Sequence, residues 1–281
     1  MSDISSTYPS LAGRTIMVTG GSRGLGREMV LALAEAGASL AVVGSRPGPA
    51  LDATVAEANS LGSGRAIALT ADVADYAQCE AAAATAAEAF GHVDVLINNA
   101  GLGMRRVSET FNTEPTRFWE TDPTAWKDII DTNVNGAFNI ARALVPGMVA
   151  RGFGKVINIS TSDQTMVRRG YAPYGPSKAA LEAMSRVWAQ DLAGTGVDVN
   201  VYLPGGAADT DLLPPSADKK GADGNLLPAA IMRRAILWLA DDQSNGKTGG
   251  RYIARLWDEA LQPSEAAAAS CQPSIAKPAI M

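Results

Sequence analysis

Short apolar runs alternate with helical patterns along almost the whole of this chain. Residues 14–19 form an apolar, partly β-branched run that ends in glycines, and residues 24–36 follow with Leu25, Met29 and Leu33 at helical spacing. Runs that are apolar throughout predict parallel strands buried on both faces. We therefore expect a doubly wound α/β fold, in which helices cover both faces of a parallel sheet. The expected strands are residues 14–19, 40–43, 66–70, 93–97, 155–159, 198–202 and 251–254, and the expected helices are residues 24–36, 50–61, 77–90, 126–150, 174–192 and 231–240.

No repeat and no linker divides the chain. The sequence therefore predicts a single domain over residues 13–260, preceded by an N-terminal extension at residues 1–12. Residues 261–281 are rich in alanine, proline and serine, which predicts a poorly ordered tail. Residues 209–227 contain prolines, glycines and charges with little periodicity. A loop of this length inside a domain is typical of a lid, and we expect it to cover a substrate site.

Composition excludes several classes of partner. The 281 residues carry a net charge of −5, which gives no electrostatic basis for binding nucleic acid or an anionic membrane. No run is long enough to span a bilayer, and residues 1–11 lack the apolar segment of a secretion signal. Cys79 and Cys271 are isolated and there is a single histidine, so neither a disulfide framework nor a metal site is expected. These features favour a reduced, cytoplasmic compartment.

A glycine-rich turn lies between the first expected strand and the first expected helix. Residues 19–26 read Thr-Gly-Gly-Ser-Arg-Gly-Leu-Gly. Glycines there allow a tight turn and the close approach of backbone to a pyrophosphate, and the helix N-terminus beyond them offers N–H groups to phosphate. The spacing Gly-x-x-x-Gly-x-Gly differs from the commoner Gly-x-Gly-x-x-Gly, but the strand–turn–helix context still indicates a dinucleotide site. The residues expected to form it are Gly20, Ser22, Arg23, Gly24, Leu25 and Gly26.

Tyr174 and Lys178 lie one helical turn apart, so their side chains share one helix face. A lysine cation favours phenolate, and we expect Lys178 to lower the pKa of Tyr174 from its reference value near ~10. A tyrosine with a lowered pKa is a proton donor and acceptor suited to the reversible oxidation of an alcohol. The same spacing also occurs on ordinary solvated helices, so the interpretation depends on the motifs around the pair.

Together these motifs resemble one family, the short-chain dehydrogenases/reductases, over about residues 11–254. The motifs that carry the resemblance are the glycine turn, Asn98-Asn99-Ala100-Gly101 after the fourth strand, Asn133, and the pair Tyr174 and Lys178. The resemblance implies a Rossmann-type sheet that binds a nicotinamide dinucleotide. It also implies a homotetramer or homodimer.

By position, the resemblance implies further contacts to that cofactor. Asp72 is expected to hydrogen-bond the adenine amino group and Val73 to face the adenine ring, while Lys178 holds the nicotinamide ribose. Thr210 is the expected contact to the carboxamide, with Asp209 as the alternative, because this chain has one extra residue after its Pro-Gly stretch. The other cofactor contacts implied are Asn99, Ala100, Gly101, Tyr174, Pro204 and Gly205.

The residues after the second strand favour NADP(H) over NAD(H). A carboxylate at that point would accept from a ribose 2′-hydroxyl and repel a 2′-phosphate. This chain has Gly44, Ser45 and Arg46 there, with no acid. Arg46 and Arg23 could together pair with a phosphate dianion, a role that suits arginine. The alternative is that both arginines are ordinary surface residues.

The resemblance also implies a catalytic hydroxyl thirteen residues before the tyrosine, where this chain has Thr161 instead of serine. Ser162 is the alternative, although the alternation of a strand turns it to the other face. In the implied mechanism a hydride passes between the nicotinamide and a carbinol or carbonyl carbon. Tyr174 moves the proton, Thr161 orients the substrate oxygen, and Asn133 holds a water that links Lys178 to solvent.

The sequence says less about the substrate, which we expect to be a small alcohol or carbonyl compound. Segments 102–124, 165–172 and 209–227 are expected to wall the pocket. Their arginines could favour an anionic substrate or could serve a solvated face; they are Arg105, Arg106, Arg168 and Arg169. Two rival functions remain open: a non-catalytic dinucleotide-binding regulatory protein, and an epimerase or dehydratase acting on a nucleotide sugar.

Overall fold

One sheet runs through the molecule in the strand order β3-β2-β1-β4-β5-β6-β7-β8. The computed structural model describes residues 4–216, 219–221 and 224–272. Neighbouring strands pair in parallel from β3 to β7, and β8 joins β7 antiparallel. The strands are β1 (Thr15–Thr19), β2 (Ser39–Gly44), β3 (Ala66–Thr70), β4 (Val95–Asn98), β5 (Gly154–Ile159), β6 (Val197–Leu203), β7 (Arg251–Ile253) and β8 (Cys271–Gln272).

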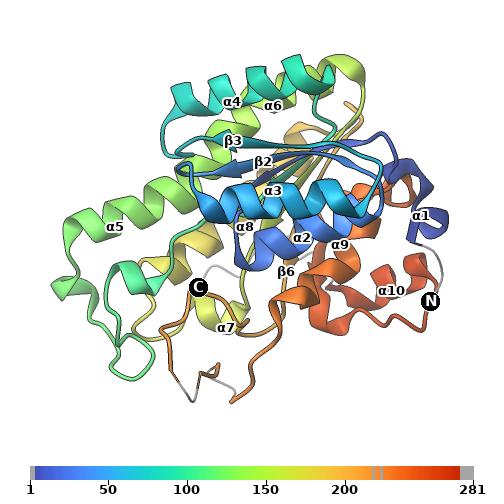
Figure 1. Cartoon of the computed structure of the whole chain (residues 1–281). Coiled ribbons are helices and arrows are strands. Elements are labelled where there is room, and N and C mark those ends of the chain that lie inside the picture. The colour runs from blue at the N-terminus through green and yellow to red at the C-terminus, as the bar shows by residue number, and fades with distance from the viewer. Residues whose placement is uncertain (1–3, 217–218, 222–223, 273–281) are drawn as a thin grey trace.

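Helices cover both faces of the sheet (Figure 1). One face packs against α2 (Gly24–Glu35), α3 (Pro49–Leu61), α9 (Arg233–Ala240) and α10 (Pro263–Ser270), and the other against α4 (Tyr76–Phe90), α6 (Gly136–Arg151) and α8 (Tyr174–Asp191). The remaining helices are α1 (Ile4–Thr7), α5 (Pro123–Ile130) and α7 (Asp163–Met166). The predicted doubly wound α/β fold is confirmed.

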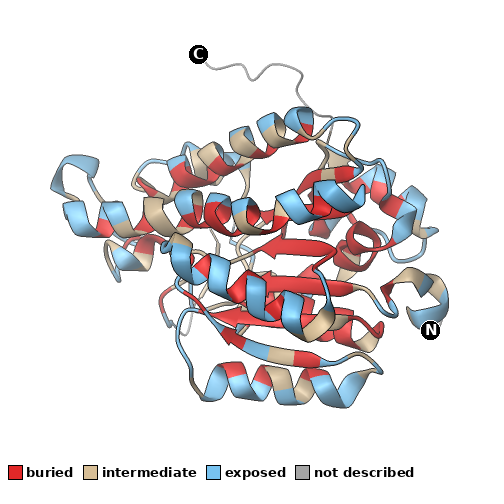
Figure 2. Cartoon of the chain, turned by 90° about the horizontal axis from the view of Figure 1, so that it is seen from above, coloured by how far each residue is buried: buried red, intermediate tan, exposed pale blue. Residues whose placement is uncertain are grey.

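Alternation along the strands divides the core into two layers. In β1, Ile16 and Val18 belong to the layer under α2 and α9, and Met17 belongs to the layer under α4 and α6. All three are fully buried. Figure 2 shows the buried strands at the centre and exposed residues on the outer faces of the helices. Both faces of the central strands are therefore shielded from solvent, as their uninterrupted apolar runs predict.

The strand order reverses at β1, which has β2 on one side and β4 on the other. The segments that follow β1 and β4 leave the sheet at the same edge, the carboxyl edge. In open α/β sheets a ligand binds at such a switch point, in the crevice beyond the carboxyl ends of the strands. The fold thus places the glycine turn and the Asn98–Gly101 motif beside each other.

Two expected elements differ from the structure. The helix expected over residues 126–150 is interrupted by a π-helical turn, Asp131–Asn135, between α5 and α6. The tail expected to be poorly ordered from residue 261 instead forms α10 and β8 as far as Gln272. That prediction was wrong for these residues, because Ala266 and Ala267 are buried in the core and β8 extends the sheet. Residues 273–281 lie outside the described residues.

The predicted N-terminal extension packs onto the domain. Tyr8 and Leu11 are buried in the larger core layer, and the Ser10 hydroxyl donates to Asp241 at 2.5 Å. Residues 1–3 lie outside the described residues.

The predicted lid, residues 209–227, forms no helix where it is described, and Ala208 and Leu227 form a bridge at its base. Residues 217–218 and 222–223 are not described. Within the described ranges, no helix combines the length and apolar content that crossing a membrane would need.

Candidate active site

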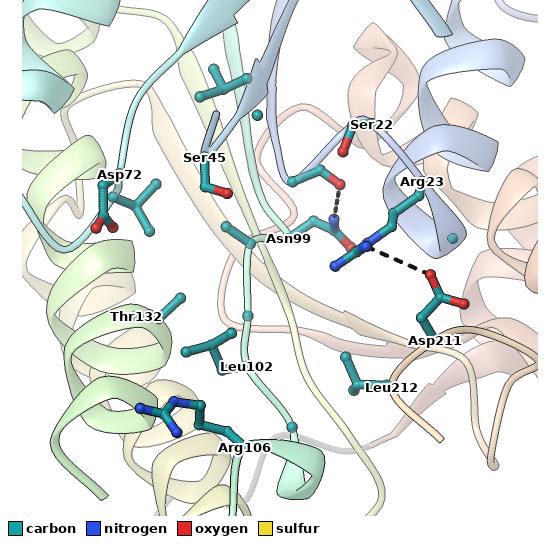
Figure 3. Close-up of a pocket in the computed structure, with 18 of the residues that line it drawn as sticks. Ser22, Arg23, Ser45, Asp72, Asn99, Leu102, Arg106, Thr132, Asp211 and Leu212 are labelled. Atoms are coloured by element: carbon teal, nitrogen blue, oxygen red, sulfur yellow. Dashed lines mark hydrogen bonds and ion pairs between the residues drawn. The ribbon is translucent and has the colours of Figure 1, made fainter. Parts of the chain in front are cut away.

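A cavity of ≈ 1100 Å³ opens at the carboxyl edge of the sheet, at the switch point (Figure 3). It brings together most of the residues that the sequence singles out. Those that line it are Gly20, Ser22, Arg23, Gly24, Leu25, Ser45, Arg46, Asp72, Val73, Asn99, Ala100, Gly101, Tyr174, Lys178 and Thr210. Five other predicted site residues do not line it: Gly26, Asn133, Thr161, Pro204 and Gly205.

The glycine turn is packed so tightly that side chains would not fit. A Cβ on Gly20 would lie 2.9 Å from Ala100 Cα, and Gly20 adopts φ +65°. A Cβ on Gly26 would lie 2.2 Å from the Gly20 carbonyl oxygen. The Asn99 amide donates to the carbonyls of Thr19 and Gly20, both at 3.0 Å. Asn99 therefore ties the turn to the end of β4, and the turn presents backbone to the cavity.

The first turn of α2 faces the cavity without a side-chain cap, since its N-cap residue, Arg23, makes no capping bond. Uncapped N–H groups and the positive end of the helix dipole suit a phosphate. Thr210 lies directly against this turn: a Cβ on Gly24 would be 3.2 Å from its methyl carbon. These features fit a dinucleotide, whose pyrophosphate the turn and the α2 N-terminus would hold.

Of the two arginines expected at the 2′-phosphate, the one in the glycine turn already has an acidic partner. Arg23 forms an ion pair with Asp211 at 3.6 Å, with both side chains 70% exposed. Figure 3 shows this pair face to face, with Ser45 further along the cavity. Arg46 also lines the cavity and is exposed. An exposed pair contributes only about 0.2–1 kcal/mol, so Arg23 remains free to exchange its partner.

Asp72 and Val73 follow β3, as expected of residues at an adenine site. Asp72 is exposed, and its carboxylate accepts from the Ala74 N–H at 3.0 Å. Val73 is buried and packs against Gly136, where a Cβ would lie 2.5 Å from the valine methyl. The contact fixes the wall of the cavity to the start of α6. The adenine contacts themselves stay a prediction.

Tyr174 and Lys178 lie in the first turns of α8 and both face the cavity. The Thr161 side chain lies close enough to the Tyr174 phenol to lower its pKa. Lys178 is buried, and its ammonium donates to the Ile159 carbonyl at 2.9 Å. The hydroxyl, the phenol and the ammonium are thus gathered at the end of β5.

Burial dominates the titration of this pair. It raises the pKa of Tyr174 to about 12, against a lowering by the Thr161 side chain, because phenolate is poorly solvated there. Burial also lowers the pKa of Lys178 to about 8, against the attraction of Glu182. The predicted lowering of the Tyr174 pKa was wrong for this structure, because burial is the largest cause of its shift and Lys178 is not among the causes.

Only one of the three hydroxyls after β5 is directed at the tyrosine. The Ser160 hydroxyl donates to Glu182 at 2.6 Å. The Ser162 hydroxyl caps α7 and lies 2.9 Å from the Thr165 hydroxyl. This leaves Thr161 as the hydroxyl beside the phenol, as alternation along an extended chain would arrange, and its catalytic role stays a prediction.

Asn133 lies in the π-helical turn and is almost fully buried. Its amide exchanges two hydrogen bonds with the Leu102 backbone, at 2.8 and 3.0 Å, and donates to the Ser177 hydroxyl at 2.9 Å. The side chain thus joins the segment after β4 to α8. The water that Asn133 is predicted to hold stays a prediction. The π-helical turn has no signal in the sequence, although such turns are frequent at functional sites.

Of the four arginines expected near the substrate, Arg105 and Arg106 line the cavity, and both are paired. Arg105 forms a two-pronged ion pair with Glu109 and donates to the Asp211 carbonyl at 2.8 Å. Arg106 pairs with Asp128 at 2.6 Å. Segment 102–124 was expected to wall the pocket, but its two aromatic residues, Phe118 and Trp119, do not line the cavity. They are 65% and 68% exposed. Arg168 stacks on the Tyr171 ring, 4.8 Å from its centre.

A parallel sheet with a glycine turn at its switch point, and a half-buried tyrosine and a buried lysine facing the same cavity, defines the class of NAD(P)-dependent oxidoreductases. A family model described as short chain dehydrogenase matches residues 14–221. The chain belongs to the short-chain dehydrogenase/reductase family.

Known members are similar over most of the chain. A short-chain type dehydrogenase/reductase of Picea abies is 39% identical over 207 residues, which are 72% of this chain and 73% of that protein. The 3-oxoacyl-acyl-carrier-protein reductase FabG of Thermotoga maritima is 30% identical over 245 residues, covering 85% of this chain and 95% of that protein. A crystal structure of a short-chain type dehydrogenase/reductase from Mycobacterium marinum superposes with a TM-score of 0.76 at 27% identity, over 87% of this chain and 94% of that one.

Proposed function

We propose that this oxidoreductase transfers a hydride between a nicotinamide and a secondary alcohol or its ketone, with Tyr174 as the general acid and base. The observation that carries the proposal is that Tyr174 and the buried Lys178, one helical turn apart, both line the cavity at the end of β5, with the Thr161 side chain beside the phenol. When bound, the nicotinamide dinucleotide supplies or accepts the hydride. The chain's own residues move the proton and orient the substrate oxygen.

Each residue has a distinct task in the proposed reaction. The Tyr174 phenol gives its proton to the carbonyl oxygen during reduction and takes it back during oxidation. The Thr161 hydroxyl donates to the same oxygen, which a neutral hydrogen bond of about 0.5–1.5 kcal/mol can orient. Lys178 supplies positive charge, and Asn133 fixes Leu102 at the cavity wall while its water connects Lys178 to solvent. The segment at 209–227 covers the substrate.

The proposed cofactor is NADP(H). Ser45 and Arg46 line the cavity where an acid would reject a 2′-phosphate, and Arg23 is held only by an exposed ion pair with Asp211. A phosphate dianion with three acceptor oxygens is the stronger partner for an arginine.

The proposed substrate is a small neutral alcohol or carbonyl compound. Arg105 and Arg106 line the cavity, and both already pair with carboxylates. The T. maritima relative is named for reduction of a 3-oxoacyl group, which supports a carbonyl carbon as the reacting centre. A cytoplasmic location and a homotetrameric or homodimeric assembly remain part of the proposal.

The direct test is turnover by wild-type protein and by Tyr174→Phe on a panel of alcohols and ketones, followed at the absorbance band of reduced nicotinamide. We expect wild-type turnover, no turnover by the phenylalanine variant, and dinucleotide affinity within about twofold of wild type, since only the hydroxyl is removed. Undiminished turnover by Tyr174→Phe would refute the mechanism. Tight dinucleotide binding without turnover on any substrate would favour the regulatory-protein alternative.

A further inference from the structure

Behind the catalytic hydroxyl lies an arginine that the reaction does not use directly. Arg251 stands at the start of β7, and its side chain is only 14% exposed. Its Nη2 donates to the Thr161 carbonyl at 2.9 Å and its Nε donates to the Glu182 carboxylate at 2.9 Å. The same guanidinium also contacts Asp163 and the Gln272 side chain. The rigid, planar guanidinium therefore joins β7 to three other segments: residues 161–163, α8 and β8.

Glu182 completes the connection from the other side. It lies on α8 four residues after Lys178 and eight after Tyr174, so it lies along the same side of the helix. Its carboxylate accepts from the Ser160 hydroxyl at 2.6 Å. Glu182 thus holds Ser160, the residue before the catalytic threonine, and Arg251 holds the carbonyl of Thr161 itself.

The regular strand ends at the same point. The Ser160 N–H donates to the Tyr202 carbonyl at 2.9 Å, which is the last bond of strand type from this segment to β6. One residue later the Thr161 carbonyl is bonded by the Arg251 guanidinium. A hydroxyl placed just after a strand end needs such a partner, because a displacement of about 1 Å in a catalytic group can cost on the order of 100-fold in rate.

We infer that Arg251 and Glu182 are positioning residues, which hold the Ser160–Thr161 peptide so that the Thr161 hydroxyl faces the Tyr174 phenol. The inference rests on the proposed role of Thr161. It also gives the C-terminal strand a part in catalysis, because Gln272 of β8 is bonded to the same guanidinium.

The test starts with Arg251→Met, which keeps the length of the apolar stem and removes the guanidinium. We expect kcat to fall about ten- to a hundred-fold, with KM and dinucleotide affinity within about twofold of wild type. Arg251→Lys should recover little of the loss, because one ammonium cannot span the carbonyl and the carboxylate as the fork does. Arg14→Met is the matched control: Arg14 has the same 14% exposure and an ion pair with Asp242, but it lies at the opposite edge of the sheet.

A double-mutant cycle with Thr161→Val separates positioning from general stability. If Arg251 acts through the threonine hydroxyl, Arg251→Met should change kcat by less than about twofold in the Thr161→Val background. A full loss in that background, or wild-type kcat in Arg251→Met alone, would overturn the inference. Should Arg251→Met not fold, Arg251→Gln, which also removes the guanidinium, replaces it in the same cycle, with the same outcomes. Absence of turnover in the wild-type protein would instead refute the proposed function.

Discussion

Replacing Gly26 by alanine tests whether the packing of the glycine turn sets dinucleotide affinity. The added methyl would lie 2.2 Å from the Gly20 carbonyl oxygen and 2.4 Å from the Asn99 side-chain nitrogen. Neither atom is the free end of a flexible chain: the first is backbone, and the second donates to the Thr19 and Gly20 carbonyls. Relief of the overlap therefore requires the turn itself to move by roughly 1 Å, since non-bonded carbon contacts lie near 3.5 Å.

Strain of this kind typically costs about 1–3 kcal/mol. If the bound dinucleotide requires the original turn, the cost appears in the binding free energy, and affinity falls roughly 5- to 150-fold. Stability is a poorer measure, because alanine is favoured over glycine by about 1 kcal/mol inside a helix and partly offsets the strain. The Gly26→Ala effect should thus be larger on binding than on the melting temperature.

Titration of reduced dinucleotide by fluorescence measures the affinity directly. Gly147→Ala is the matched control: Gly147 also lies inside a helix, and its added methyl would meet only the Arg151 guanidinium at 3.4 Å. This variant should bind with wild-type affinity and melt at the same or a higher temperature. Wild-type affinity in Gly26→Ala would refute the argument from packing.

Two more results are expected. Arg23→Gln and Arg46→Gln should each weaken NADP about tenfold, the value of a charge-assisted bond, and leave NAD unchanged in calorimetric titrations; equal losses for both cofactors would contradict the 2′-phosphate argument. Burial lowers the pKa of Lys155 to about 8, below its value in the unfolded chain, so the unfolded state binds more protons between about pH 8 and 10 and stability should rise with pH there. Lys155→Met should show a smaller rise in the urea midpoint from pH 7 to 9.5, and an equal rise would rule Lys155 out as the source.

The sheet could be predicted because its signals are local. Apolar runs such as residues 40–43 match β2 to within two residues at each end. Tyr174 and Lys178 could be paired because helix geometry alone relates positions four apart. The link from these two to Thr161 came from resemblance to a family, since no local rule connects residues thirteen apart across a loop.

Other features depend on contacts that no local pattern records. Arg251 lies 90 residues from Thr161 and 69 from Glu182, and only the pairing of β7 with β6 brings them together. The order of the C-terminal segment depends on such contacts too. Its alanine-rich composition predicts disorder, yet small side chains are what allow α10 to pack closely on the core, where Ala266 and Ala267 are buried.

The pKa of Tyr174 shows why a motif does not fix its own chemistry. The spacing places the Lys178 cation on the same helix face, but burial removes water from both groups and is the largest cause of the pKa shift of each. At pH 7 both side chains are therefore protonated. A general acid works best when its pKa lies near the operating pH, so the phenol of Tyr174 needs more than its spacing to Lys178 to act as proton donor and acceptor. The residues around a motif, and not its spacing alone, therefore set the acidity on which the proposed function depends.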